Sequence, residues 1–326
     1  MSTKNRIPVL VIFAPTASGK TALTRELFSP AGSHFILKAE VISADSQAVY
    51  KGMDIGTAKP EPSFCKEIPH HMIDLVSPDC QFSVSDFVER ADILCRDIYQ
   101  RGKLPLVCGG TGFYIRNFLF GLPSTPKSDE KIRNQLKERI EKEGNQSLYE
   151  ELCRIDPESA AKIHVNDAYR ICRALEVFYT TGKKRSESQL SVKLRDLYDF
   201  CFIVLEPERE LLFERIRKRV DLMFEDGLRG EVEKLIKAGY TKESPGMKAI
   251  GYSEFFDPAL KGDDEKIREA IKHHSCKYAK KQYTYIRDIP ESKVIRYNAM
   301  EMDLQKIADL IGKFAERTGF SIDLKA

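Results

Sequence analysis

The segment 14–21 constrains the fold of this chain more than any other feature, because its composition and its position suit a phosphate-binding loop. It follows the apolar run 8–13, and a helix is expected to begin near Gly19. In such a strand–loop–helix unit, backbone N–H groups and the helix dipole surround a diphosphate, a lysine neutralises it and a hydroxyl meets Mg²⁺. Lys20 and Thr21 would fill these last two roles, and a plain connecting turn is the alternative. The segment comprises Ala14, Pro15, Thr16, Ala17, Ser18, Gly19, Lys20 and Thr21.

Four short apolar runs alternate with helical patterns, which predicts a P-loop α/β fold: a parallel sheet with helices on both faces. The runs are Ile7–Phe13, Glu40–Ala44, Leu104–Cys108 and Phe200–Leu205. A helix is expected from the capping-box residues Ser83 and Asp86 to Gly102, and further helices at 208–224 and 264–287. No strand pattern occurs at 128–182, so we expect an all-helical domain at 123–197, inserted between core segments 1–122 and 198–326.

Composition narrows the class of protein. The longest apolar runs of the 326 residues are far shorter than the roughly 20 residues of a membrane span. The residues before the first strand show no apolar signal region, so a signal peptide is not expected. The eight cysteines form no Cys-x-x-Cys pair, so a zinc site is not expected. The pairs His70-His71 and His273-His274 lack further ligands at metal-binding spacing and are interpreted as structural or hydrogen-bonding. We expect a cytoplasmic monomer.

Two further segments carry candidate chemistry. Asp45 follows the second strand, at the sheet edge where the phosphate-binding loop also opens. It could assist Mg²⁺ in the second shell, act as a general base or merely cap a turn. The Gly109-Gly110-Thr111-Gly112 junction follows the third strand, and its glycines permit close approach of a ligand while Thr111 supplies the one hydroxyl.

A basic helix is expected towards the C-terminus. Between positions 268 and 287 there are six Lys or Arg residues and one acid, Glu269. Its predicted apolar stripe is Ile267, Ile271, Tyr278 and Tyr285. Interleaved cations and aromatic rings suit a nucleic-acid backbone with stacked bases, although a solvated charged face is the alternative. The cations are Arg268, Lys272, Lys277, Lys280, Lys281 and Arg287.

Collinear blocks between Pro8 and about Arg287 resemble those of the bacterial tRNA dimethylallyltransferases, also called tRNA isopentenylpyrophosphate transferases. The residues that carry this resemblance are Pro15–Thr21, Asp45-Ser46, Val49–Pro60, Pro69–His71, Gly109–Tyr114, Asp156–Glu158, Arg173–Val177, Arg215-Ile216, Arg219–Asp221, Gly227-Leu228, Ala249–Tyr252 and Lys281–Arg287.

The resemblance implies transfer of a dimethylallyl group from dimethylallyl diphosphate to N6 of adenosine 37, in tRNAs reading codons that begin with U. It implies that Lys20 and Arg219 hold the diphosphate, that Thr21 binds Mg²⁺, that Asp45 removes the amine proton and that Thr111 contacts the reacting groups. The partner would be the tRNA anticodon stem-loop, contacted by Asp45, Ser46, Gln47, Ala48, Thr111, Arg133, Tyr169, Arg170, Ile171, Cys172, Arg173, Lys248, Gly251, Tyr252, Lys280, Lys281, Gln282 and Arg287.

Departures from the family pattern lie mainly in the binding segments. Ala14 replaces a glycine, Gln47-Ala48 replaces Met-Gln, Tyr169 replaces a common glutamine, and Lys281 and Tyr285 replace arginine and tryptophan. Three alternatives stay open. The chain could prenylate free AMP or ATP, it could be an ATP-binding small-molecule P-loop kinase, or it could be an RNA-binding module with an inert loop.

Overall fold

The computed structural model describes residues 6–123, 129–188, 193–285, 287, 289, 294–298 and 303–322. The chain forms two compact units. Unit 1 contains residues 1–119 and 195–326, and unit 2 contains residues 120–194. These boundaries lie a few residues from the expected limits of the inserted domain.

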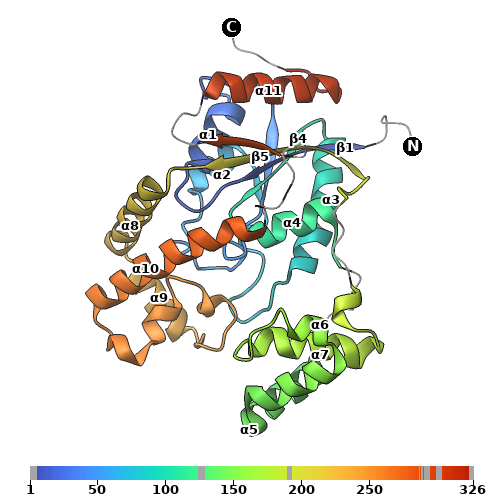
Figure 1. Cartoon of the computed structure of the whole chain (residues 1–326). Coiled ribbons are helices and arrows are strands. Elements are labelled where there is room, and N and C mark those ends of the chain that lie inside the picture. Colours follow the sequence, from blue (N-terminus) through green and yellow to red (C-terminus); the bar gives the residue numbers. More distant parts are fainter. Residues whose placement is uncertain are drawn as a thin grey trace. The chain divides into compact units, whose positions relative to one another are not determined.

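Unit 1 is built on a parallel sheet, which has six strands in the described part of the chain, in the order β3-β2-β4-β1-β5-β6 (Figure 1). The four predicted strands are confirmed as β1 (Ile7–Phe13), β2 (Ala39–Ser43), β4 (Leu104–Gly109) and β5 (Tyr198–Glu206). Two further strands, β3 (His70–His71) and β6 (Ile295–Asn298), were not predicted and form the two edges of the sheet.

Helices cover both faces of this sheet, as predicted. On one face Leu10 and Ile12 of β1 pack with Leu23 of α1 and Ile311 of α11, and all four side chains are almost completely buried. On the other face Phe118 of α4 packs edge-on against Phe200 of β5. The helices of unit 1 are α1 (Lys20–Phe28), α2 (Pro62–Glu67), α3 (Val84–Gln100), α4 (Gly112–Phe120), α8 (Arg209–Glu225), α9 (Leu228–Lys237), α10 (Asp264–Gln282) and α11 (Leu304–Arg317).

The ends of two helices, α3 and α10, can be compared with the ends predicted from the sequence. The predicted capping box is confirmed: Ser83 and Asp86 exchange hydrogen bonds at the start of α3. The predicted basic helix is shorter than expected, since α10 ends at Gln282 and a 3-10 turn follows at Tyr283–Tyr285. The Tyr283 hydroxyl donates to the carbonyl of Leu205 at 3.1 Å, which draws the chain back to the sheet. Ile286, which belongs to the last block of the resemblance, lies outside the described residues.

Unit 2 consists of helices in its described residues: α5 (Glu130–Ile155), α6 (Pro157–Ala160), α7 (Ala168–Thr181) and a short 3-10 turn. Leu148, Leu152, Ile171 and Leu175 are fully buried and form its core. Within unit 1, the two ends that lead to unit 2 are joined, because the Arg195 N–H donates to the Leu119 carbonyl at 2.9 Å.

Three of the four histidines in the two predicted pairs, namely His70, His71 and His274, make hydrogen bonds, as expected. His71 Nε2 lies 2.7 Å from a Glu40 carboxylate oxygen, and His70 Nδ1 lies 2.6 Å from the Ile68 carbonyl. His274 Nδ1 lies 2.7 Å from Glu254. No helix in the described segments is long and apolar enough to cross a membrane.

Candidate active site

The loop 14–21 joins β1 to α1 and has the backbone shape of an anion-binding loop. Ala17 and Gly19 have φ values of 60° and 92°, in the left-handed region that orients successive N–H groups towards one side. Ala14 has no such φ, so its methyl group causes no backbone strain at this position. The departure from glycine is therefore accommodated, with Ala14 fully buried and its N–H donating to Gly109 at 3.2 Å.

The Lys20 ammonium lies inside this loop with only neutral acceptors. Its Nζ donates to the carbonyls of Ala14 at 2.8 Å and Pro15 at 2.7 Å. Burial lowers the pKa of Lys20 to about 8, with Cys108 and Asp45 opposing the shift and Arg219 adding to it. A buried cation without a carboxylate partner is stabilised when an anion binds beside it.

A second cation reaches the loop from α8. Arg219 Nη1 donates to the Thr16 hydroxyl at 2.8 Å, although the two residues lie far apart in the sequence. Burial lowers the pKa of Arg219, and Asp45 opposes that shift. Lys20 and Arg219 thus bring two positive charges to the same loop, as an anionic diphosphate requires.

Asp45 lies beyond the end of β2, in a turn that orients its carboxylate. Its Oδ1 accepts the N–H groups of Gln47 at 2.8 Å and Ala48 at 3.4 Å. Thr111 supports the same turn, because its Oγ1 accepts the Ser46 N–H at 3.0 Å. Oδ2 has no hydrogen-bond partner among the described residues, so one carboxylate oxygen is available for a substrate proton.

Gln47 offers a further acceptor near Asp45. Its Oε1 is buried and has no hydrogen-bond partner in the part of the chain that the structure describes, whereas Nε2 donates to Ser46 Oγ at 3.3 Å. An unpaired buried carbonyl oxygen is costly unless a ligand donor reaches it. Gln47 lines the same cavity as Asp45, so this acceptor suits an amine of the substrate.

The glycine-rich junction lies against the end of β2 and has no room for side chains. A Cβ at Gly109 would lie 2.2 Å from the Ala44 carbonyl oxygen, and a Cβ at Gly110 would lie 2.5 Å from Gln282 Nε2. Gln282 links this junction to the phosphate-binding loop: it donates to the Gly110 carbonyl at 2.7 Å and accepts the Thr16 N–H at 3.3 Å.

One cavity of about 530 Å³ brings these groups together. Lys20, Thr21, Asp45, Thr111 and Arg219 all line it, as do Tyr278 and Gln282 from α10. No group of three His, Cys, Asp or Glu side chains in the described segments could hold a metal ion.

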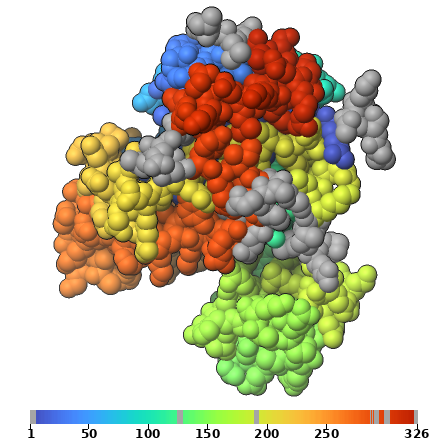
Figure 2. Space-filling view, turned by 45° about the horizontal axis from the view of Figure 1, so that its top comes forward, coloured from blue at the N-terminus to red at the C-terminus, as the bar shows by residue number. Residues whose placement is uncertain are grey.

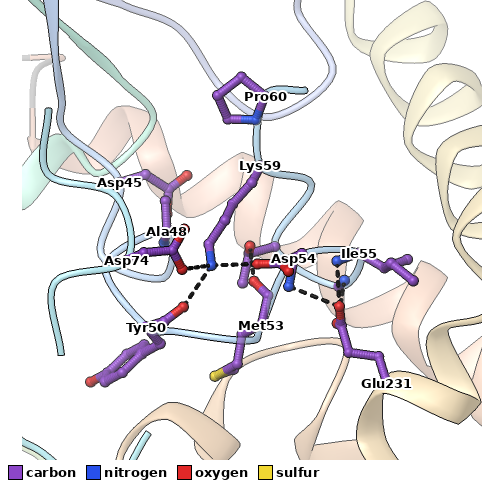
Figure 3. A network of polar contacts seen from close by, with 12 residues as sticks. Asp45, Ala48, Tyr50, Met53, Asp54, Ile55, Lys59, Pro60, Asp74 and Glu231 are labelled. Carbon is purple, nitrogen blue, oxygen red and sulfur yellow. Dashed lines mark hydrogen bonds and ion pairs between the residues drawn. The ribbon is translucent and has the colours of Figure 1, made fainter. Parts of the chain in front are cut away.

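A loop at 52–60 forms another wall of the cavity and is fixed by polar contacts (Figure 3). Lys59 Nζ donates to the Tyr50 carbonyl at 2.6 Å, Asp54 at 2.7 Å and Asp74 at 2.6 Å. Glu231 accepts backbone N–H groups from the same loop. Sequence reasoning assigned no role to Lys59 or Glu231, and it placed Tyr278 only in the apolar stripe of the basic helix. The run of small and turn-forming residues at 52–60 was the available signal.

Residues of unit 1 that were expected to contact tRNA differ in exposure. α8 and α10 lie side by side at the surface (Figure 2), and Lys272 of α10 pairs with Asp221 of α8 at 2.7 Å. Lys281 and Arg287 are exposed, whereas Gln282 is buried. The exposed residues of this set are Lys248, Lys280, Lys281 and Arg287, and the buried ones are Ala48, Gly251, Tyr252 and Gln282.

Three further observations concern the same segments. Tyr278 and Tyr285 of the predicted apolar stripe are 39% and 37% exposed, so only Ile267 and Ile271 pack as expected. The Gly251 N–H donates to Glu254 at 2.9 Å. The Tyr252 side chain is fully buried, so any contact of Tyr252 with RNA would involve its backbone.

The residues predicted for tRNA binding in unit 2 lie on α5 and α7. Tyr169 is 78% exposed at the start of α7, where Arg170 pairs with Asp167. Arg173 pairs with Glu176, and Arg133 lies on α5. Ile171 and Cys172 are buried in the core of the unit, so their side chains serve packing.

The sheet, the loop 14–21 and the cations around it define a P-loop α/β protein with an anion-binding cavity. The model of the IPP transferase family matches residues 48–289. The chain therefore belongs to the IPP transferase family, and the resemblance inferred from the sequence is confirmed.

Relatives with assigned names are similar in sequence to this chain over most of its length. A protein of Geotalea uraniireducens named tRNA dimethylallyltransferase 2 is 42% identical over 90% of this chain and 94% of its own. A tRNA dimethylallyltransferase of Acetivibrio thermocellus is also 42% identical, over 93% and 96%. The crystal structure of the tRNA isopentenylpyrophosphate transferase of Bacillus halodurans is 34% identical with a TM-score of 0.66, covering 96% of this chain and 98% of that one.

A eukaryotic dimethylallyltransferase, whose structures are described as snapshots of its action on tRNA, has a TM-score of 0.77 and 29% identity. The match covers 98% of this chain and 81% of the eukaryotic one. The same fold thus occurs in bacterial and eukaryotic transferases.

Proposed function

We propose that this protein transfers the dimethylallyl group of dimethylallyl diphosphate to N6 of adenosine 37, in tRNAs reading codons that begin with U. The names of its relatives support a tRNA substrate. The observation that carries the proposal is the cavity in which Lys20 and Arg219 meet the phosphate-binding loop and which Asp45 also lines. Such a site suits a leaving diphosphate and a nucleophile that must lose a proton.

In the proposed reaction the allylic C–O bond breaks and an N–C bond forms to the exocyclic amine. Negative charge grows on the departing diphosphate, where Lys20, Arg219 and the loop N–H groups stabilise it. Their fixed positions in a buried site make this stabilisation stronger than in water. No phosphoryl group is transferred, so the loop acts only on the leaving group.

Asp45 accepts the proton that the amine loses. The two backbone N–H groups on Oδ1 hold the carboxylate, and Oδ2 is available for the substrate. Thr111 keeps the turn of Asp45 in place through Ser46 and lines the cavity beside it. The adenine must leave the anticodon stack to reach these groups, as bases do in other enzymes that modify them.

We also propose Mg²⁺ as the cofactor, with Thr21 as its protein ligand and Asp45 as a second-shell contact. Thr21 is exposed to the cavity next to Lys20, so its hydroxyl fits a cation shared with a diphosphate. When bound there, Mg²⁺ would add positive charge to the leaving group. We further propose that the protein acts as a cytoplasmic monomer, since one chain supplies every group named above.

The test incubates the protein with Mg²⁺, labelled dimethylallyl diphosphate and unmodified tRNA carrying adenosine 37, with AMP and ATP as competing acceptors. Label in tRNA that is lost when adenosine 37 is replaced would support the proposal. Label in the free nucleotides would instead indicate an adenylate prenyltransferase. Consumption of ATP with phosphoryl transfer would indicate a kinase, and binding of tRNA without any transfer would indicate an RNA-binding module.

A further inference from the structure

Several backbone N–H groups of the loop 52–60 converge on one point, where a carboxylate of the protein accepts their hydrogen bonds (Figure 3). Glu231 of α9 accepts the N–H of Asp54 at 2.9 Å, of Ile55 at 2.8 Å and of Gly56 at 3.2 Å. Three successive N–H groups on one carboxylate is the arrangement that otherwise binds a free anion. Here Glu231 is the permanent occupant, which fixes the loop.

Tyr252 completes the attachment. Its hydroxyl donates to Glu231 Oε1 at 2.6 Å, and its ring is fully buried. A Cβ added at Gly56 would lie 2.5 Å from this ring, so the loop backbone packs directly on the aromatic face. Glu231 therefore joins the loop to the turn 249–252 through charge-assisted hydrogen bonds, which are about twice as strong as neutral ones.

Lys59 holds the other end of the loop. Its side chain is only 6% exposed, and the carboxylates of Asp54 and Asp74 neutralise its ammonium. Figure 3 shows this ammonium pointing into the loop's own network. Lys59 therefore acts as a structural cation, although it lines the same cavity as Lys20.

The loop is strained between these two attachments. Ala58 has a φ of 48°, a left-handed conformation that costs a residue with a Cβ about 1 kcal/mol or more. A residue keeps such an unfavourable backbone conformation only where surrounding contacts impose it, and such residues are frequent at ligand sites. Gly56 to Pro60 line the main cavity, and Ala58 to Pro60 also border a hollow lined by Thr21 and Arg219.

We propose that Glu231 is a positioning residue for the prenyl donor. By holding the backbone of Asp54, Ile55 and Gly56, it fixes the wall at 56–60 beside the groups that bind the diphosphate. A fixed wall limits the conformations of the bound donor, and this pre-organisation lowers the KM for the donor without taking part in the chemistry. The inference rests on the proposed function, because it assigns a role in binding dimethylallyl diphosphate.

The experiment compares Glu231→Gln and Glu231→Ala with Glu233→Gln. Glu233 lies on the same helix and is 51% exposed, and its ion pair with Arg229 has an N–O distance of 3.7 Å, so it controls for charge and for the helix. We expect the KM for dimethylallyl diphosphate to rise about tenfold in Glu231→Ala and less in Glu231→Gln, which keeps one acceptor oxygen. The kcat should stay within about twofold, and Glu233→Gln should behave as wild type.

A second readout separates positioning from a general loss of folding. Binding of inorganic diphosphate, measured by calorimetry on folded protein, should weaken in Glu231→Ala and stay unchanged in Glu233→Gln. Hydrogen exchange of the amides at 54–56 should quicken in the Glu231 variants and stay unchanged in Glu233→Gln. Tyr252→Phe, a milder change that removes one donor to Glu231, should give a smaller effect in the same direction.

The outcomes distinguish the two proposals. If wild-type protein transfers no label to tRNA, the proposed function fails. If wild type is active and the folded Glu231 variants keep the wild-type KM and diphosphate affinity, the positioning role of Glu231 is wrong. A fall in kcat at unchanged KM would likewise overturn it, since the residue would then act on the chemical step.

Discussion

Two lysines line the same cavity, and their surroundings are opposite. Lys20 Nζ meets only the carbonyls of Ala14 and Pro15, and burial lowers its pKa to about 8. Lys59 Nζ meets the carboxylates of Asp54 and Asp74. In this cavity the charge that the protein leaves without a counter-ion is therefore available to a ligand, whereas the charge with its own counter-ions holds the structure.

Two acids near β2 repeat this contrast. Glu40, within the strand, is almost fully buried and is bound by Arg101, by Lys103 at 2.7 Å and by His71 at 2.7 Å. The hydrogen bond from Arg101 leads the contacts that hold the pKa of Glu40 far below its usual range. Asp45, just beyond the strand, receives only backbone N–H groups of its own turn.

The largest expected effect concerns the two acids. Asp45→Asn should lower kcat by about 10³-fold, because general-base catalysis contributes on the order of 10²–10⁴-fold, while the melting temperature changes little. Glu40→Gln should lower the free energy of unfolding by about 3 kcal/mol, since Arg101 and Lys103 lose a buried partner. Its folded fraction should keep wild-type kcat. Equal losses of kcat in the two variants would contradict the assignment of Asp45 to catalysis and of Glu40 to the structure.

Replacing either lysine should have the next largest effect on activity. Lys20→Met should lower kcat/KM by about 10²-fold, as expected when a group that stabilises a leaving anion is removed. Lys59→Met should lower it only about tenfold and should reduce the free energy of unfolding by about 1 kcal/mol, because two partly exposed carboxylates lose their cation. Steady-state kinetics measures kcat/KM and thermal unfolding measures the stability of both variants. Lys66→Met, at an exposed position of α2, is the control. A larger kinetic loss in Lys59→Met would contradict the assignment.

Diphosphate binding should depend on pH through the Lys20 ammonium. The free protein loses the Lys20 proton above about pH 8, and binding of an anion favours the protonated form. Affinity for inorganic diphosphate should therefore be constant below pH 8 once the phosphate is ionised, and should fall by up to about tenfold per pH unit above it. Calorimetry in two buffers should show proton uptake at pH 8.5. No uptake there would mean that Lys20 keeps its proton in the free protein.

The smallest effect is expected at Gln282. Gln282→Ala removes the link between Thr16 and Gly110, so a buried carbonyl and a loop N–H lose their partners at a cost of about 1–2 kcal/mol. Diphosphate affinity should fall a few-fold, while Gln305→Ala on α11 should have no effect. Unchanged affinity in folded Gln282→Ala would show that the phosphate-binding loop keeps its shape without this link.

The interior of the fold was predictable from the sequence, and its edges were not. β1, β2, β4 and β5 are buried strands and appear as apolar runs, which local patterns reveal. β3 has two histidines, and β6 reads Ile-Arg-Tyr-Asn. Edge strands are short and polar because one side lacks a neighbouring strand, so they carry no such pattern.

The candidate site also has a part that was predictable from the sequence and a part that was not. Loop motifs predicted Lys20, Thr21, Asp45 and Thr111, because each follows a strand at the ligand-binding edge. Neither the Arg219–Thr16 contact nor the role of Glu231 was visible locally, since each joins segments more than 170 residues apart. The length of α10 was overestimated, because the contact of Tyr283 with β5 that ends it is also tertiary.

The hydrogen bond between Leu119 and Arg195 has an evolutionary consequence. This bond holds together the two ends of the segment that forms unit 2 and so closes a neck at its base. For the stability of unit 1, the segment therefore acts as a loop whose ends are fixed. The entropy of closing such a loop grows slowly, by about 0.6 kcal/mol for each doubling of length. Insertions, deletions or an exchange of the whole helical unit can therefore accumulate beyond the neck at little cost to the stability of the sheet.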